Sequence, residues 1–292
     1  MARSVTRSAV LGGTGGSAWD DNILSHSPAI VGVKKIDIRH GNQVDRLQVT
    51  YRLADGSTYT APAHGGTGGS LSSFTLAKNE RIVRMEGKTN NVLVDQVTFV
   101  TQNDAGEEKT YGPFGQTGQT QFKVEGYIVG FFGRAGNLLD ALGAYYLPPL
   151  TKSPTYGGTG GKAFADPVDV NIPPVVNVKR MRIRHGNQVD SIDADYQLLG
   201  GGVLDGSNHG GTGGRPTVVE FEDGEFIIAM TGKTNNVLVD QVTFTTRKRN
   251  GTTATYGPFG KTGETKYEVT GNIVGFFGRA GNLLDAIGAF YC

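Results

Sequence analysis

The sequence predicts an all-β protein made of two similar domains of antiparallel strands. Segments such as 46–53, 95–100 and 123–128 alternate polar and apolar residues and are rich in β-branched and aromatic side chains, as half-buried strands are. Glycine-rich clusters separate these segments, and no stretch of helix length shows a helical apolar period. Such a succession of short strands and turns folds into a sandwich, a barrel or a prism.

The prediction of two domains rests on an internal repeat. Gly12 recurs as Gly157 and Asp140 recurs as Asp285, and this offset of 145 residues holds without a gap along the chain. Between the repeats lies Leu147-Pro-Pro-Leu-Thr151, where two adjacent prolines exclude a central strand and indicate a short, stiff linker. We therefore expect one domain over residues 1–146, a linker over 147–151 and a second domain over 152–292.

Composition and charge narrow the classes of partner. The chain has 28 Lys and Arg against 27 Asp and Glu, without a run of like charge, so neither nucleic acid nor membrane insertion is expected. No window is apolar enough for a membrane helix or a secretion signal. The single cysteine, Cys292, excludes an intrachain disulfide, so we expect a cytoplasmic or nucleocytoplasmic protein.

A weaker, threefold pattern lies inside each repeat. Gly41–Asp45, Thr89–Leu93 and Gly136–Asp140 each lead into a strand, and the fifth residue of each precedes an aromatic residue by six positions. Three glycine loops recur in the same way, and they are Gly12–Gly16, Gly65–Gly69 and Gly115–Gln119. Three similar four-stranded units in each domain account for this pattern most simply.

These motifs resemble those of the jacalin-related lectins. In both repeats the similarity rests on the Gly-Gly-Thr-Gly-Gly loop near the start, on Tyr-Gly-Pro-Phe-Gly, and on Gly-Phe-Phe-Gly-Arg-Ala-Gly-Asn-Leu-Leu-Asp-Ala near the end. It covers nearly the whole chain. The resemblance implies a tandem, mannose-specific lectin with two type I β-prism domains, each made of three four-stranded Greek-key sheets around a pseudo-threefold axis.

In this family a sugar lies between the glycine loop and a Gly-x-x-x-Asp turn. By resemblance to mannose-specific members, Asp140 accepts hydrogen bonds from the sugar O4 and O6 hydroxyls. The N–H groups of Asn137 and Leu138 donate to the ring oxygen and O6, and that of Gly16 donates to O3. We call this the first site, and its counterparts in the second domain are Gly161, Asn282, Leu283 and Asp285.

Some family members carry a second site on the neighbouring sheet, and the chain matches that motif as well. This second site comprises Asp45 with Asn42, Gln43 and Gly69 in the first domain, and Asp190 with Asn187, Gln188 and Gly214 in the second domain. The third position of each domain is expected to be vacant, because Leu93 and Leu238 stand in place of the carboxylate. The resemblance thus implies two sites per domain and four per chain.

The residue types of these motifs suit sugar binding. A glycine loop has no side chains, so its backbone N–H groups can approach a flat pyranose ring and donate to its hydroxyls. An ionised carboxylate accepts several hydrogen bonds, so one aspartate can hold two neighbouring hydroxyls.

Other functions are less well supported by the sequence. A glycosidase generally needs two carboxylates facing each other, and each predicted site supplies one, so no catalytic residue is assigned. His40 and His64 with Asp45 fit no familiar metal-ligand spacing, so neither a metal nor a cofactor is expected. A structural or membrane-associated module with galactose-type specificity is the alternative.

Two further pairs of residues have structural interpretations. Asp21 and Asp166 follow the first glycine loop of each repeat and are expected to accept hydrogen bonds in turns. Trp19 and Phe164 occupy equivalent positions, and we expect them to pack in the core.

The expected specificity is for mannose or glucose over galactose. Galactose-specific relatives resemble jacalin itself, which has a cleaved chain with a free N-terminal glycine beside the site, whereas Val10 and Leu11 lead unbroken into Gly12. Family members often dimerise through their sheets, so a homodimer is also expected, with no face singled out.

Overall fold

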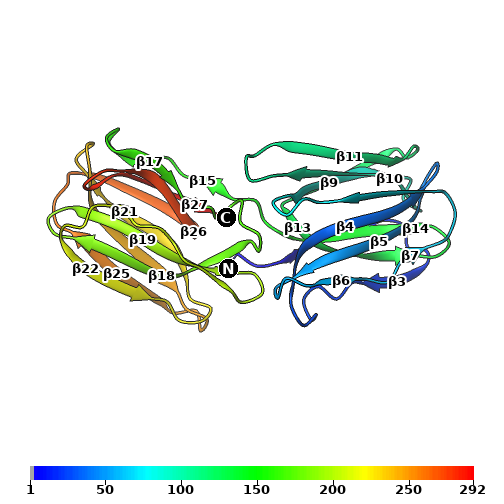
Figure 1. The fold of residues 1–292 in the computed structure, drawn as a ribbon, viewed down its shortest axis with the longest axis horizontal. Coiled ribbons are helices and arrows are strands. Elements are labelled where there is room, and N and C mark those ends of the chain that lie inside the picture. Colours follow the sequence, from blue (N-terminus) through cyan, green and yellow to red (C-terminus); the bar gives the residue numbers. More distant parts are fainter. Residues whose placement is uncertain (1–2) are drawn as a thin grey trace. The chain divides into compact units, whose positions relative to one another are not determined.

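The computed structural model describes residues 3–292, and these residues form strands joined by turns, with no helix among them (Figure 1). The all-β prediction is confirmed. Within the same residues there is accordingly no helix that could cross a membrane.

The chain divides into two compact domains. The first comprises Ser4–Pro149 and Val170–Pro173, and the second comprises Leu150–Asp169 and Pro174–Cys292. Arg3 also belongs to the second domain, where its Nη1 donates a hydrogen bond to the Val175 carbonyl at 2.8 Å. This division differs from the expected one because Arg3 belongs to the second domain and Val170–Pro173 belongs to the first.

The linker is shorter than expected. Strand β14 (Leu139–Leu147) ends at the first residue of the predicted linker, and β15 (Thr151–Lys152) begins at its last. Residues 148–150, which include both prolines, therefore form the connection.

The first domain contains three sheets. Their orders are β1-β14-β13-β3 with β2 beside β14, β6-β5-β4-β8 with β7 beside β5, and β11-β10-β9-β12. In the last two the fourth strand returns beside the first, which is a Greek key. The strands are β1 Thr6–Arg7, β2 Leu11–Gly12, β3 Ser17–Asp20, β4 Ile30–His40, β5 Val44–Leu53, β6 Thr58–Thr60, β7 His64–Gly65, β8 Ser70–Thr75, β9 Arg81–Thr89, β10 Val94–Gln102, β11 Glu108–Gly115, β12 Thr120–Glu125 and β13 Tyr127–Ala135.

The second domain repeats this arrangement, with two of its sheets joined. The orders are β20-β19-β18-β22 with β21 beside β19, and β15-β27-β26-β23-β24-β25 with β16 beside β27 and β17 beside β26. The strands are β16 Tyr156–Gly157, β17 Lys162–Ala165, β18 Val175–His185, β19 Val189–Leu198, β20 Val203–Leu204, β21 His209–Gly210, β22 Arg215–Glu220, β23 Phe226–Thr234, β24 Val239–Arg247, β25 Thr253–Gly260, β26 Thr265–Ala280 and β27 Leu284–Tyr291.

One predicted strand is interrupted. Residues 123–128 were expected to be continuous, but β12 ends before Gly126 and β13 begins after it. Gly126 has a φ of 136° and Gly271 of β26 has a φ of 137°, in the region that favours glycine. The same left-handed glycine thus recurs in both domains. In the first domain the chain passes there from one sheet to the next, and in the second β26 continues through it and joins two sheets.

Aromatic side chains from strands that are not neighbours meet in the core of each domain. Phe99 of β10 and Phe131 of β13 are fully buried and pack edge to face with ring centroids 5.8 Å apart. Phe244 and Phe276 repeat this contact at 5.7 Å in the second domain. Because inward-facing residues alternate with outward-facing ones along each strand, the sheets enclose one apolar core per domain.

We expect Phe99→Ala to lower the free energy of unfolding of the first domain by about 3–5 kcal/mol, because a large buried ring leaves a cavity. Thermal and denaturant unfolding of the full chain measure this change. Leu24→Ala, at a side chain that is 70% exposed, is the control and should alter stability by less than about 0.5 kcal/mol. Equal effects of the two substitutions would contradict the assigned core.

Candidate functional site

The aspartate turn of the first site joins β13 to β14. Gly136 N donates to the Leu138 carbonyl at 3.0 Å and closes the turn. No other hydrogen bond within residues 3–292 engages the N–H groups of Asn137 and Leu138. These two donors are therefore left for a ligand or for water.

Asp140 follows this turn at a β-bulge. Arg134 pairs with Ala141 and Ala135 pairs with Leu139, so Asp140 has no partner across the hairpin. A bulge leaves its extra residue outside the ladder and re-aims the side chain, which is why bulges occur beside binding sites.

The glycine loop Gly12–Gly16 lies against the Asp140 carboxylate. A Cβ atom at Gly15 would be 2.3 Å from Asp140 Oδ1, and one at Gly16 would be 2.5 Å from Oδ2. Gly16 also has a φ of 56°, in the left-handed region. Both positions require glycine, because any side chain would displace the carboxylate.

The Asp140 carboxylate has unused hydrogen-bonding capacity. It accepts no hydrogen bond from the described residues, and its Oδ2 is buried without a partner. A buried acceptor without a donor costs free energy, so a ligand hydroxyl that supplies the donor recovers it. The first site thus combines an open acceptor with two open donors in one turn.

The other three predicted sites have the same geometry. Asp45 lies at a bulge between the pairs Arg39–Arg46 and His40–Val44. A Cβ atom at Gly68 would be 2.4 Å from its Oδ1, and the corresponding distances from Gly160 to Asp285 and from Gly213 to Asp190 are both 2.3 Å. Within residues 3–292, none of these three carboxylates accepts a hydrogen bond either.

Each predicted site residue lies in one of these turns or loops. The turns contribute Asn42, Gln43 and Asp45, then Asn137, Leu138 and Asp140, then Asn187, Gln188 and Asp190, and then Asn282, Leu283 and Asp285, and the loops contribute Gly16, Gly69, Gly161 and Gly214.

The third position differs from the prediction, because it does contain a carboxylate. A Cβ atom at the first glycine of each loop would lie 2.3, 2.1 and 2.0 Å from the carbonyl oxygens of Asp140, Asp45 and Asp95 respectively. Asp95 is also the bulged residue, between the pairs Thr89–Val94 and Lys88–Gln96. The residue equivalent to Asp140 is therefore Asp95, and in the second domain Asp240, and the assignment to Leu93 and Leu238 was wrong.

The spacing of the aromatic residue explains this error. Phe99 follows Asp95 by four positions, whereas Tyr51 and Tyr146 follow Asp45 and Asp140 by six, so alignment on the aromatic residue placed Leu93 where Asp95 belongs. The turn over residues 90–93 is also one residue longer than those over 41–43 and 136–138. Asn90, the first residue of this turn, accepts hydrogen bonds through its Oδ1 from Val92 N at 2.9 Å and Leu93 N at 2.8 Å. Donors that are open in the first site are thus already engaged here.

The third carboxylate is also engaged by the protein. Thr117 Oγ1 donates to Asp95 Oδ1 at 2.9 Å, and Asn90 Nδ2 lies 3.3 Å from the same atom. Asp240 is held alike by Thr262 at 2.8 Å and by Asn235 at 3.4 Å. Both aspartates are only 1% exposed. That the third position binds no sugar stays a prediction, now because its polar groups are shielded and partly satisfied.

The loops and turns of each domain contact one another in a ring. A Cβ atom at Gly66, in the second glycine loop, would be 2.3 Å from the Asn137 carbonyl oxygen of the first site. A Cβ atom at Gly13 would be 2.3 Å from the Val92 carbonyl oxygen, and Gln116 N donates to the Asn42 carbonyl at 2.9 Å. Each glycine loop therefore supports the turn of a neighbouring position, and the loop of the third position supports the second site.

Asp21 and Trp19 have different roles from those expected. The Tyr51 hydroxyl donates to Asp21 Oδ2, and His64 Nε2 lies 2.8 Å from Asp21 Oδ1. Burial, and then the Asp21 charge, raise the pKa of Tyr51 well above its ordinary value. Trp19 is half-buried and stacks on His64 at 3.8 Å, so it covers this network instead of filling the core.

The second domain repeats this network, with His209 in the position of His64. Asp166 accepts from Tyr196, His209 Nε2 lies 3.0 Å from Asp166 Oδ1, and Phe164 stacks on His209 at 3.9 Å. His40 Nε2 lies 2.8 Å from Ser72 Oγ. Across residues 3–292, no group of three or more His, Cys, Asp or Glu side chains is arranged to hold a metal ion.

The comparisons with known proteins assign the family. The family model of the Jacalin-like lectin domain matches the chain twice, over residues 8–145 and 153–290. The chain belongs to the jacalin-related lectins. Members of this family bind carbohydrates and are not enzymes, so the sites described above belong to a lectin whose two domains are the type I β-prisms of this family.

Individual relatives are consistent with this jacalin-related lectin assignment. An agglutinin from Castanea crenata is 31% identical over an alignment of 315 positions, gaps included, that covers 95% of each protein. A mannose/glucose-specific lectin from Parkia platycephala is 32% identical over 212 residues, covering 68% of this chain and 45% of the relative. The solved structure of a mannose-binding jacalin-related lectin from Ananas comosus is 33% identical, with a TM-score of 0.43, and covers 49% of this chain and 98% of that chain.

We expect Gly15→Ala combined with Gly160→Ala to weaken carbohydrate binding at both first sites by about tenfold or more, because the added methyl groups displace the carboxylates. Gly41→Ala with Gly186→Ala is the matched control, since a Cβ atom there meets nothing within 4 Å. Glycan-array binding by the two variants measures the difference. Unchanged binding by the first variant would show that the loop and carboxylate do not act together.

Proposed function

We propose that this jacalin-related lectin binds mannose- and glucose-type glycans through four sites, two in each domain. The observation that carries the proposal is that four aspartate carboxylates lie under glycine loops without a hydrogen-bond donor from the described residues. The two aspartates at the third positions have such donors. Four open acceptors beside open backbone donors are suited to a polyhydroxylated, uncharged ligand.

Each site engages one pyranose residue in this proposal. Asp140 accepts from the O4 and O6 hydroxyls, while the N–H groups of the adjoining turn donate to O6 and to the ring oxygen. The N–H of Gly16 donates to O3 from the opposite loop. A mannose/glucose-specific lectin in the same family supports this choice of sugar.

Discrimination against galactose follows from the geometry of two hydroxyls on one carboxylate. Galactose inverts the configuration at C4, so its O4 points away from the position where Asp140 would accept it. The loss of one charge-assisted hydrogen bond costs about 1–3 kcal/mol, which corresponds to a preference of about tenfold or more for mannose.

Isothermal titration calorimetry of the full chain with methyl α-mannoside and methyl α-galactoside measures this preference. We expect millimolar binding of the mannoside, about −4 kcal/mol, because water competes for every hydroxyl of a monosaccharide in a shallow site. Asp140→Ala with Asp285→Ala should remove half of the binding sites and leave the protein folded. Equal affinity for the two sugars would refute the specificity, and an unchanged stoichiometry in the double variant would refute the assignment of the first sites.

Several weak sites in one chain provide avidity. When one site has bound a branched glycan, a second site on the same chain binds at a high effective concentration, which can raise the apparent affinity by about 10²–10⁴ where the geometry permits. Duplication of the domain doubles the number of sites without requiring any site to become tighter.

Inactivating one domain in the full chain tests this role of duplication. We expect Asp45→Ala with Asp140→Ala to reduce agglutination of mannose-bearing cells by about tenfold or more, since both sites of the first domain are lost. The monosaccharide affinity of the remaining sites should stay the same. The oligomeric state of both proteins must be measured in parallel, and equal agglutination by two monomers would contradict a role for duplication.

A further inference from the structure

An arginine holds the glycine loop at each first site. Arg134 Nε donates to the Gly15 carbonyl at 2.7 Å, and its Nη2 donates to the Gly16 carbonyl at 2.6 Å. Arg279 makes the same pair of bonds, at 2.7 Å to Gly160 and 2.8 Å to Gly161. Two parallel N–H bonds from one rigid guanidinium define the position and the orientation of the loop.

The second sites have an arginine at the equivalent position, but its hydrogen bonds to the glycine loop differ between the two domains. Arg184 donates through Nε to the Gly213 carbonyl at 2.7 Å and through Nη2 to the Gly214 carbonyl at 3.1 Å. Arg39 uses a single nitrogen, Nη1, which lies 3.0 Å from the Gly69 carbonyl oxygen, 3.3 Å from that of Thr67 and 3.5 Å from that of Gly68. The loop of the second site is therefore held less firmly in the first domain than in the second.

At the third positions this arginine is replaced by lysine. Lys88 pairs with Gln96, the residue after the bulged Asp95, as Arg134 pairs with Ala141 after Asp140. Lys233 is its counterpart in the second domain. Within residues 3–292, neither lysine makes a hydrogen bond to a glycine-loop carbonyl.

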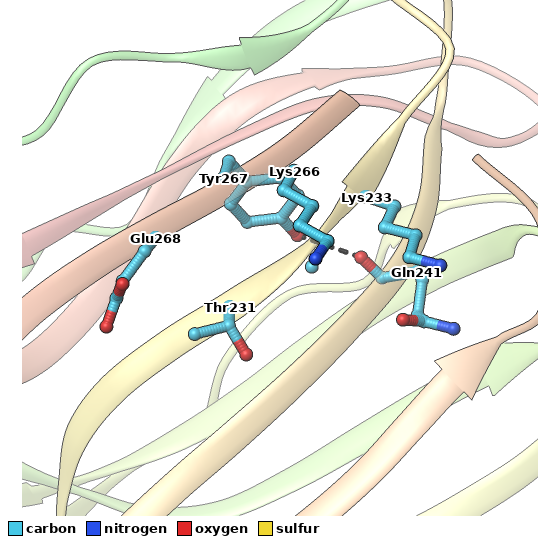
Figure 2. Close-up of a pocket in the computed structure, with 7 residues that line it drawn as sticks. Thr231, Lys233, Gln241, Lys266, Tyr267 and Glu268 are labelled. Carbon is cyan, nitrogen blue, oxygen red and sulfur yellow. Dashed lines mark hydrogen bonds between the residues drawn. The ribbon is translucent and has the colours of Figure 1, made fainter. Parts of the chain in front are cut away.

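The surroundings of Lys233 are visible in Figure 2. Its side chain lines a shallow hollow on the sheet with Gln241 and Lys266, the residue that faces it across the strands. The hydrogen bond drawn there joins Tyr267 to the Gln241 carbonyl and does not involve the lysine. A lysine head group, without a planar fork, has no geometric equivalent of the arginine contact.

The arginine acts on the sugar-binding N–H group through one peptide plane. The Gly15 carbonyl and the Gly16 N–H belong to the same peptide unit, which is planar and trans, so the two groups point in opposite directions. A guanidinium that holds the carbonyl on one side therefore directs the N–H to the other side. A loop that is already ordered loses less conformational entropy when a sugar binds.

We propose that Arg134, Arg279, Arg184 and Arg39 are positioning residues that aim the last glycine N–H of each loop into its sugar site. This inference rests on the proposed function. The presence of the arginine at the four predicted sites and its absence from the two shielded positions are the observations that carry it. A free, mobile loop would present the same N–H in many directions and bind more weakly.

The first test is the conservative exchange Arg134→Lys with Arg279→Lys, in a chain whose second sites are silenced by Asp45→Ala and Asp190→Ala. We expect its affinity for methyl α-mannoside, measured by calorimetry, to fall about tenfold relative to the silenced chain. Arg84→Lys is the matched control, because Arg84 pairs with Glu86 at 3.1 Å on the third sheet and touches no glycine loop. Unchanged affinity in the double lysine variant would overturn the proposal.

A second set of variants, in which the first sites are silenced instead, distinguishes a positioning role of the arginines from a general loss of structure. With the first sites silenced by Asp140→Ala and Asp285→Ala, the same two lysine exchanges should leave second-site affinity unchanged. A fall there, together with a lower melting temperature, would show a general structural role and overturn the proposal. Arg184→Lys should weaken its own site more than Arg39→Lys does, in line with the two bonds of Arg184.

Amide ¹⁵N relaxation of the sugar-free chain supplies a measurement that does not depend on the ligand. The exchanges Arg134→Lys and Arg279→Lys should lower the order parameters of Gly16 and Gly161 and leave those of Gly69 and Gly214 unchanged. Unchanged order at Gly16 and Gly161 would overturn the positioning role. Failure of the unsubstituted chain to bind any mannoside would instead refute the proposed function, so the two failures are distinguishable.

Discussion

The close approach of a glycine backbone to an aspartate carboxylate is the constraint on which each site depends. At Gly15 and Gly16 a single added carbon would lie within about 2.5 Å of the Asp140 oxygens, which is far inside van der Waals contact. The loop therefore has to be glycine, and it covers the carboxylate without supplying it with a donor. A partly desolvated acceptor is costly to leave unpaired, and a sugar hydroxyl can relieve that cost.

The strand ladder makes this approach possible. Strands β2 and β3 pair with β14 and β13, so the glycine loop crosses the end of the hairpin that carries Asp140. The bulge after the turn removes Asp140 from the ladder and leaves its side chain under the loop. The binding geometry is thus a product of backbone hydrogen bonding, and few side chains are needed to maintain it.

Comparison of the three positions in one domain shows how small a change separates an open site from a shielded one. All three positions have a bulged aspartate beneath a glycine-containing loop. In the third, an asparagine of the longer turn engages the backbone donors, a threonine engages the carboxylate, and lysine replaces the arginine that holds the loop. The shielded position still supports its neighbour, because the backbone N–H groups of Gln116 and Thr117 donate to the Asn42 carbonyl of the second site at 2.9 and 3.3 Å.

The sequence by itself determined the all-β class and the duplicated domain, because alternating strands and glycine loops are local patterns that recur at one offset. The same local motifs, through their resemblance to a known family, predicted the four aspartate sites. It misplaced the third carboxylate, because Phe99 lies four positions after its aspartate where Tyr51 and Tyr146 lie six after theirs, and only pairing across the ladder reveals that these aromatic residues are not equivalent. The roles of Asp21, Trp19 and Arg134 were likewise decided only by the tertiary structure. Their partners lie 30 or more residues away for Asp21 and about 120 residues away for Arg134, so no local spacing links them.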